Sequence, residues 1–256
     1  QYEAYPKITD IFPVNSVGIV TARDNLTIKW TPEEIWRTIL NFSKLDIELA
    51  RQAYNLGKDA RDWKVELAQK DLKESGLDKK KIKPILYRPF DIRYTYYTGK
   101  SRGFHCMPRP EVMHHMMQEN LALVTTRQMD ESGVQPVFVS NSIIDAHSIT
   151  SAVSISYLFP LYLYQQKDKP RKKSSNSIMM LFEPQEGYRV KKPNLPTALI
   201  ETLTKSFKKS LSPEQIFYYI YAVLYSNIYR TKYAEFLRID FPRIPFTKDY
   251  KLFNRM

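Results

Sequence analysis

The pattern of apolar and polar positions predicts helices in the first third of the chain. Apolar side chains recur every three or four residues over 31–42, where a threonine, a first-turn proline and a glutamate form the sequence of a capping box. Two more segments, 47–54 and 61–74, have the same period, and the second ends at a Ser-Gly pair. We therefore expect residues 1–80 to be mainly helical.

Beyond residue 80 the pattern changes to short apolar and aromatic runs, which are typical of strands. Two of these runs, 82–87 and 93–97, flank an Arg-Pro-Phe-Asp corner with suitable turn residues. Further strands are expected at 121–126, 136–139 and 154–164. A Ser-Pro-Glu-Gln capping box then opens the longest expected helix, about 213–237. The predicted fold is α+β: a helical N-terminal part, followed by a mixed, curved β-sheet with a long C-terminal helix packed on it.

Composition limits the class of protein. The chain has 256 residues, 43% of them hydrophobic, which is enough for a substantial core. No stretch approaches the roughly 20 uncharged apolar residues of a membrane helix, so we expect no membrane partner. The single cysteine, Cys106, excludes an internal disulfide and fits the reducing cytoplasm. The opening residues, from Gln1, lack a secretory signal, and we expect a piece of a longer chain.

Charge points to a polyanionic partner. The net charge is +12, from 39 basic and 27 acidic residues, and such an excess favours nucleic acid through counterion release. The basic residues are not spread evenly. They outnumber acidic ones most clearly in 78–127 and 167–192.

Motifs for catalysis are missing from the sequence. The triplet 99–101 resembles the end of a P-loop, but Tyr94 stands where the first glycine is required. The sequence has neither the Pro-Pro of amino-methyltransferases nor a complete Pro-Asp…Asp/Glu-x-Lys nuclease core. The possible metal ligands lack the spacing of zinc sites: His105, Cys106, His114 and His115. We therefore expect no catalytic residue, metal or cofactor in this fragment.

The first candidates for DNA contacts surround a Gly-Lys-Ser-Arg-Gly turn. Lys100, Arg102 and Arg109 lie in or near it, and basic residues on loops are suited to phosphate contacts. The two glycines, Gly99 and Gly103, would let the backbone approach a partner closely.

A second group of candidates lies at the end of a predicted strand. Its side chains are of types that read base edges: Thr125, Thr126, Arg127 and Gln128. The basic loop 166–177 would reach phosphates without sequence preference through Arg171, Lys172 and Lys173.

Other conspicuous residues have a structural interpretation. Arg88 and Arg93 bracket Asp91, which predicts an Arg–Asp pair that holds the corner rather than a DNA contact. The tyrosines at 218–221 are predicted to pack in the core.

Several sequence blocks follow one another from about Asp10 to Phe246. They are the run Tyr87-Arg88-Pro89-Phe90-Asp91 with Arg93 after it, Arg109-Pro110-Glu111-Val112-Met113, Phe159-Pro160-Leu161-Tyr162-Leu163-Tyr164, the helix 216–226 and the closing 240–246. In this order they resemble the C-terminal target recognition domain of Type ISP restriction–modification enzymes and of related single-chain Type II enzymes.

The resemblance implies a domain that comes last in a longer enzyme, after a nuclease, an adenine methyltransferase and, in Type ISP, an ATP-driven translocase. The implied cofactors of the parent chain are S-adenosylmethionine and Mg²⁺, with ATP if it is a Type ISP enzyme. Residues 1–80 would be a connector that follows the methyltransferase, and 81–256 the DNA target recognition domain. The resemblance names no base-contacting residue.

The function we expect is sequence-specific recognition of double-stranded DNA. The domain would place the target adenine before the upstream methyltransferase domain and license cleavage. Three alternatives stay open: a structural coupler between catalytic domains, a single-stranded nucleic-acid binding module that stacks bases on tyrosines, and a nuclease with an unrecognised centre.

Overall fold

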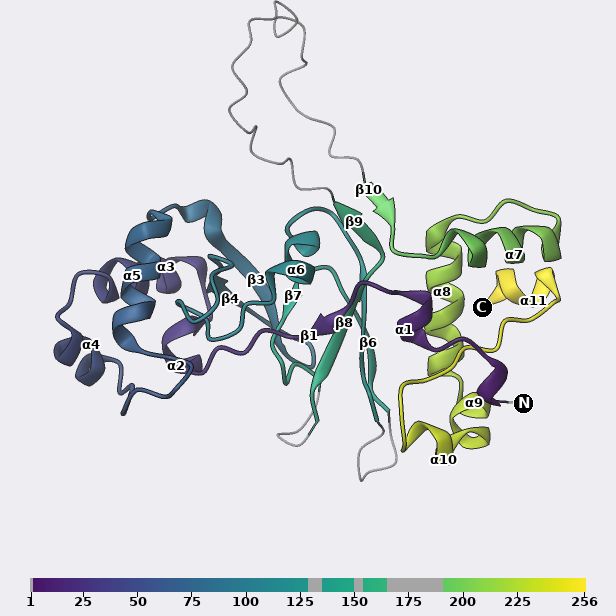
Figure 1. Cartoon of the computed structure of the whole chain (residues 1–256), viewed down its shortest axis with the longest axis horizontal. Coiled ribbons are helices and arrows are strands. Elements are labelled where there is room, and N and C mark those ends of the chain that lie inside the picture. The colour runs from purple at the N-terminus through teal and green to yellow at the C-terminus, as the bar shows by residue number, and fades with distance from the viewer. Residues whose placement is uncertain (1, 129–134, 150–153, 165–190) are drawn as a thin grey trace, which may run out of the picture.

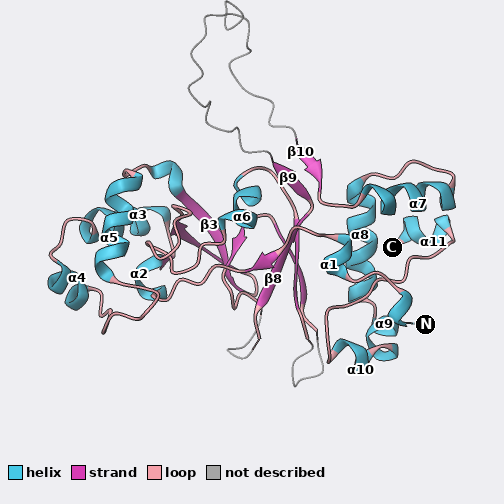
Figure 2. Ribbon diagram, in the orientation of Figure 1, coloured by secondary structure: helices cyan, strands magenta, loops and turns pink. Residues whose placement is uncertain are grey.

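Helices lie at both ends of the molecule, and strands lie between them (Figures 1 and 2). The computed structural model describes residues 2–128, 135–149, 154–164 and 191–256. Its mixture of helices and sheets confirms the predicted α+β class.

The N-terminal helical part is built on a capped helix. Its helices are α2 (Asp24–Thr27), α3 (Pro32–Phe42), α4 (Ile47–Ala53) and α5 (Val65–Ser75). The hydroxyl of Thr31 accepts a hydrogen bond from the backbone N–H of Glu34, as the capping box predicts. Helix α5 begins at Val65, later than expected, because the carboxylate of Asp59 accepts from the Val65 N–H and ends the preceding turn.

Two four-stranded sheets form the middle of the molecule. One has the order β2 (Ile28–Lys29), β4 (Asp91–Tyr96), β3 (Ile82–Arg88), β7 (Ile143–Ile144). The other has the order β1 (Ser16–Val17), β8 (Ser156–Pro160), β5 (Ala122–Thr126), β6 (Val137–Ser140). A two-stranded ribbon pairs β9 (Tyr162–Tyr164) with β10 (Lys191–Pro193). The first sheet is mixed, because β3 pairs antiparallel with β4 and parallel with β7.

Further helices lie between the strands and near both ends of the described chain. They are the 3-10 helices η1 (Tyr2–Ala4), η2 (Lys79–Lys81) and η3 (His114–Met117), and the α-helices α1 (Ile8–Ile11), α6 (Pro110–Met113), α7 (Thr197–Phe207) and α11 (Tyr250–Arg255).

The single long helix expected over 213–237 is wrong. The segment forms α8 (Pro213–Tyr225), α9 (Asn227–Lys232) and α10 (Ala234–Leu237). Ser226 takes an extended backbone conformation, and its hydroxyl accepts from the N–H of Tyr229, so it ends α8 and caps α9. The expected packing is present, since Phe217 of α8 contacts Phe12 and shares a core with Phe159 of β8.

Among the described residues, three apolar clusters hold the fold together. The first joins α8 to Leu123 and Phe159 of the second sheet. The second lies around β3, β5 and β7. The third fills the N-terminal helical part and also contains Tyr96 and Phe104, so it crosses residue 80. The helical part therefore shares buried side chains with the first sheet.

The two ends of the chain pack against each other (Figure 1). The N–H of Ile8 donates to the carbonyl of Pro242 over 3.0 Å, and the N–H of Ile244 donates to the carbonyl of Pro6 over 2.9 Å. The ring of Tyr2 stacks on Phe236. As a result, the segment 2–12 packs into the C-terminal core, mainly through Tyr2, Ile8, Ile11 and Phe12.

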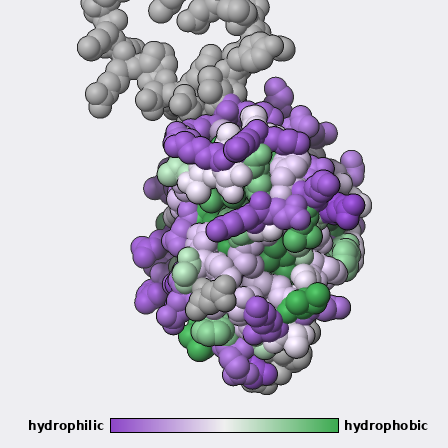
Figure 3. Space-filling view, turned by 90° about the vertical axis from the view of Figure 1, so that its right-hand side faces the viewer, coloured by the Kyte–Doolittle hydropathy of each residue, from purple (hydrophilic) through white to green (hydrophobic). Residues whose placement is uncertain are grey.

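The face formed by the C-terminal helices is mostly hydrophilic, with apolar side chains gathered between the polar ones (Figure 3). The exposed apolar and aromatic residues of these helices and their ends include Tyr218, Ile228, Ile239 and Leu252. Within the described part of the chain, no helix has the length and apolar character needed to cross a bilayer.

Candidate nucleic-acid interface

The turn 98–104 is organised by a buried carboxylate of α5. Oδ2 of Asp71 accepts hydrogen bonds from the hydroxyl of Thr98 (2.7 Å) and the N–H of Phe104 (2.8 Å). A Cβ on Gly103 would lie 2.2 Å from the same oxygen. Gly103 therefore makes room for the Asp71 carboxylate of its own chain, and its use in the approach of a partner stays a prediction. Gly99 supplies a left-handed turn, with φ of +77°.

We expect Gly103→Ala to lower the free energy of unfolding by roughly 2 kcal/mol, because its methyl group overlaps the Asp71 carboxylate. Urea unfolding measures the change. Gly57→Ala is the control: it also adds a methyl group, but nothing lies within 4 Å, so only the strain of its positive φ remains. Equal losses in the two variants would contradict the close contact.

Arg102 and Arg109 come together at a basic pocket. A cavity of about 360 Å³ is lined by both, with Arg61 and Asp62 from the turn before α5 and Glu111 from α6. Both predicted arginines have left-handed backbones, with φ of 56° for Arg102 and 53° for Arg109, and Arg109 is the residue before α6. Sequence reasoning missed Arg61, since only the fold brings 61–62 beside the turn.

The pocket keeps an excess of positive charge. Asp62 accepts from Nη2 of Arg61 (2.6 Å) and lies 3.5 Å from Nη2 of Arg102. The hydrogen bond from Arg61 lowers the pKa of Asp62, and the charge of Arg102 adds to the effect. The side chains of Arg61 and Arg102 are 89% and 68% exposed. Their remaining N–H groups can therefore meet phosphate oxygens.

Arg109 and Lys100 differ in how they are held. Nη2 of Arg109 contacts the sulfur of Met107, and its Nε is buried without a hydrogen-bond partner among the residues that the structure describes. Lys100 does not line the pocket: its Nζ is 2.6 Å from Oε2 of Glu74 on α5, and this hydrogen bond raises the pKa of Lys100.

The strand-end group forms a second, separate site at the end of β5. Nε of Arg127 is 2.9 Å from Oδ1 of Asp240, and the amide of Gln128 donates to the carbonyl of Ile239. Thr126 is buried, and its hydroxyl donates to the carbonyl of Gln128. Arg127 and Gln128 are thus exposed at the surface, while the buried Thr126 holds the backbone of Gln128 through its hydroxyl.

Other candidates of this group have different positions. Thr125 is fully buried and donates to the carbonyl of Pro136. Arg171, Lys172 and Lys173 lie outside the described residues. In the part of the chain that the structure describes, no hydrogen bond or ion pair joins the strand-end group to the basic pocket.

Asp240 ties the strand-end group to the start of the chain. It accepts from Nζ of Lys7 (2.7 Å) and Nε of Arg127 (2.9 Å). Burial raises its pKa, but these two hydrogen bonds outweigh burial and bring the pKa down to about 2. Because the pKa in the folded state lies below the ordinary 3.8, the carboxylate stabilises the fold above about pH 4, and this contribution disappears as pH falls toward 2.

We expect Asp240→Asn to lower the free energy of unfolding at pH 7 by about 1 kcal/mol, after allowance for solvent screening. Urea unfolding at pH 7 and near pH 2 checks the value, and the difference from wild type should vanish at the lower pH. Glu235→Gln removes a more exposed partner of Arg238 and should change stability little. A loss that is independent of pH would contradict the charge argument.

The arginines of the corner have different partners. Arg93 pairs with Asp91 over 2.8 Å, as expected. Arg88 instead pairs with the buried Asp145 over 2.9 Å, so Arg93 alone makes the predicted pair with Asp91. The cause is the parallel pairing of β3 with β7, which places the residue after β7 beside Arg88.

The candidate metal ligands take internal positions. His105 is buried against Thr95, and His115 accepts from the N–H of Tyr164. Cys106 is buried, and burial raises the pKa of its thiol. Over the described ranges, no group of three or more His, Cys, Asp or Glu residues could hold a metal ion.

Comparison with known proteins identifies the family of this fold. The family model of the Type ISP C-terminal specificity domain matches residues 10–256. The chain belongs to this family. The match confirms the resemblance drawn from the ordered blocks, and the specificity domain extends over both predicted parts of the chain.

Solved structures share the fold of this specificity domain. The DrdV–DNA complex, determined by cryoEM, is similar with a TM-score of 0.67 and 22% identity over 96% of this chain. The ATP-dependent Type ISP restriction–modification enzyme LlaBIII, bound to DNA, has a TM-score of 0.68 and 16% identity over 100% of this chain. A nuclease-deletion mutant of the Type ISP enzyme LlaGI, in complex with a DNA substrate mimic, has a TM-score of 0.62 and 20% identity over 99%.

The specificity domain is short beside these proteins. It spans 22% of the DrdV chain, 16% of the LlaBIII chain and 19% of the LlaGI chain. No curated protein matches it.

Proposed function

We propose that this domain recognises a specific sequence of double-stranded DNA for a restriction–modification enzyme. The match of the specificity-domain family to residues 10–256 carries the proposal. The basic pocket supports it, because exposed guanidinium groups around a cavity are suited to phosphates. The three structures with the same fold are DNA complexes.

The two groups of candidate residues would divide the work. Arg102 and Arg109, with Arg61, would hold backbone phosphates at the basic pocket, and Lys100 would extend this contact beside α5. Arg127 and Gln128 would read base edges at the end of β5, since Arg recognises guanine and Gln recognises adenine with paired hydrogen bonds. Thr126 would set their position. Arg171, Lys172 and Lys173 would add contacts without sequence preference.

The rest of the parent enzyme would supply the chemistry. The domain would present its target to an upstream adenine methyltransferase domain and license a nuclease in the same cytoplasmic polypeptide. S-adenosylmethionine, Mg²⁺ and, in a Type ISP enzyme, ATP would serve those domains. Residues 1–80 would act as the connector and 81–256 as the recognition part. The two parts would differ in function but would not fold separately, because an apolar cluster contains residues from both sides of residue 80.

Binding to duplex DNA tests the proposal directly. The domain should bind a random-sequence duplex with an affinity that falls steeply with salt, and one sequence selected from a random library more tightly. A structural coupler would show no preferred sequence, and a stacking module would be competed off by single strands. Magnesium-dependent cleavage by the domain alone would instead favour a nuclease.

An exchange experiment tests specificity in the intact enzyme. Replacing the specificity domain of one parent enzyme by that of another should transfer the methylated sequence. If the methylated sequence stays with the rest of the enzyme, the proposed function is wrong.

A further inference from the structure

Four side chains of the first sheet form a column of alternating rings and cations. Three lie on β3 and β4, and the fourth, Trp30, directly follows β2. Cζ of Arg93 lies 3.8 Å from the ring centroid of Trp30 and 4.3 Å from that of Tyr87. Cζ of Arg88 lies 3.8 Å from the ring centroid of Tyr87. The order is therefore Trp30, Arg93, Tyr87, Arg88, and three of the four layers come from the corner motif. Such contacts fix the rings in place.

The inner part of the column is neutralised within the protein. Arg88 pairs with Asp145, and Arg93 pairs with Asp91. The hydroxyl of Tyr87 donates to Asp24 over 2.8 Å. Because these groups already have partners inside the protein, the inner layers offer few free charges or hydrogen-bonding groups to an external ligand.

The outer end of the column is open. Trp30 is 62% exposed although Arg93 covers one of its faces, so the exposed area lies on the opposite face and the edges. Its backbone N–H donates to Oε2 of Glu34 over 3.1 Å, which anchors the residue at the start of α3. A large ring that is fixed in place yet exposed is suited to stacking with a flat ligand.

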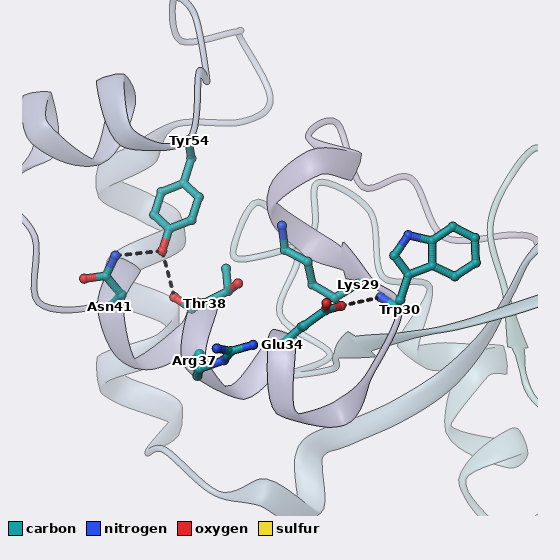
Figure 4. Close-up of a pocket in the computed structure, with 7 residues that line it drawn as sticks. All are labelled: Lys29, Trp30, Glu34, Arg37, Thr38, Asn41 and Tyr54. Atoms are coloured by element: carbon teal, nitrogen blue, oxygen red, sulfur yellow. Dashed lines mark hydrogen bonds between the residues drawn. The ribbon is translucent and has the colours of Figure 1, made fainter.

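Trp30 is one of the residues that line a cavity of about 500 Å³, and its ring projects outward from the rim of this cavity (Figure 4). Lys29 and Arg37 bring positive charge, while the carboxylate of Glu34 is bound to the backbone N–H groups of residues 30 and 31. Arg37 has no hydrogen-bond or ion-pair partner among the residues described. Burial lowers the pKa of Lys29, which a bound anion would counteract.

The far wall of the cavity is polar and ordered. The amide of Asn41 donates to the hydroxyl of Tyr54 over 3.0 Å, and this hydroxyl donates to the carbonyl of Thr38 (Figure 4). The cavity thus combines two cations and a polar wall with an exposed aromatic residue at its rim, and its volume is in the range of small-ligand sites.

We propose that this cavity binds one unpaired nucleotide, with its base stacked on the open face of Trp30 and its phosphate on Lys29 and Arg37. A base inside an intact duplex has both faces covered by its neighbours, so only an unpaired base can take this position. The inference rests on the proposed function for the source of the nucleotide, which is the DNA that the domain binds.

Binding of matched DNA substrates tests the site. Fluorescence anisotropy would compare a perfect duplex, the same duplex with one unpaired nucleotide, and a short single strand. Trp30→Leu should weaken binding of the two substrates with unpaired bases by about 5- to 100-fold, and Arg37→Gln by several-fold. The perfect duplex should bind within twofold of wild type. Trp30→Tyr should restore most of the loss, because it restores a stacking ring.

Two variants serve as matched controls. Tyr225→Leu removes another exposed ring that has an arginine, Arg230, over it, and Lys70→Gln removes an exposed charge on α5. Neither should change the ratio of affinities for the unpaired and perfect substrates.

The outcomes separate this site from the proposed function. If the perfect duplex binds but Trp30→Leu leaves the ratio unchanged, the nucleotide site is overturned and duplex recognition stands. If only substrates with unpaired bases bind, and binding depends on Trp30, the site is supported and duplex recognition fails. Weak binding of every substrate by the wild-type domain overturns both.

Discussion

Replacing Arg102 and Arg127 together by alanine is expected to weaken binding of duplex DNA by up to a hundredfold, or 1–3 kcal/mol. Each arginine is exposed, and each belongs to a different group: Arg102 to the basic pocket and Arg127 to the end of β5. Because no hydrogen bond or ion pair between described residues joins the groups, the effects of the single variants should add. Arg102→Ala should also reduce the dependence on salt by about one phosphate contact.

Titrations of labelled duplex at several salt concentrations measure these effects. The control is Lys205→Ala with Lys251→Ala, which removes the same charge from exposed positions on α7 and α11. Urea unfolding should accompany each variant, because Arg127 also binds Asp240. An equal loss of affinity in the control would mean that the effect comes from the lower net charge alone. Unchanged affinity in Arg102→Ala plus Arg127→Ala would refute the site assignment.

Acidification from pH 7 to pH 4 is expected to remove several kcal/mol of unfolding free energy through two buried histidines. The hydroxyl of Thr95 donates to the carbonyl of Thr27, so its oxygen accepts from Nε2 of His105. Nδ1 of His105 is buried without a partner in the described structure, and burial lowers the pKa to about 4. A second proton on this ring would have no acceptor.

His115 has a different geometry with the same result. Its Nδ1 accepts from the N–H of Tyr164 over 3.0 Å, so a proton on this nitrogen would break the bond. Burial, together with the adjacent His114, lowers the pKa of His115 to about 4. Both pKa values lie below the ordinary 6.5, so the stabilisation is complete above about pH 6.5 and is lost as pH falls toward 4, by on the order of 3 kcal/mol for His105 and by less for His115, which is desolvated less completely.

Urea unfolding at pH 7 and pH 4 checks this expectation. His105→Gln and His115→Gln should each be less stable at pH 7 but lose less stability on acidification than wild type. Asp240 keeps its charge over nearly all of this range, since its pKa is about 2, so Asp240→Asn should leave the histidine effect in place. If neither glutamine variant flattens the dependence on pH, the histidines are not its cause.

Local sequence signals predicted much of the fold. The capping box at Thr31 and the strands around the Arg-Pro-Phe-Asp corner form as expected, because each depends on residues within a few positions of one another. The prediction of one long helix was wrong because Ser226 caps α9. The apolar pattern continues across Ser226 and concealed this cap. The ordered blocks identified the family without locating its contacts.

The site depended on contacts between distant residues. Arg61 joins Arg102 at the pocket only because α5 packs beside the turn after β4. The sequence alone could not show that Gly103 makes room for the carboxylate of Asp71. It also could not show that Arg88 pairs with Asp145, which is 57 residues away. Trp30 was not a candidate from sequence, since its neighbour Arg93 is distant in the chain.

The pairing of the two chain ends affects how recognition could be exchanged between enzymes. Residues 2–12 and α8 contribute to one core, and the backbone bonds of Ile8 and Ile244 close it. A chimaera joined within the chain, even at residue 80, would bring together two halves of a core that come from different parents. Transferable specificity should therefore require both crossover points to lie outside residues 2–253, so that the domain is inherited as an indivisible unit.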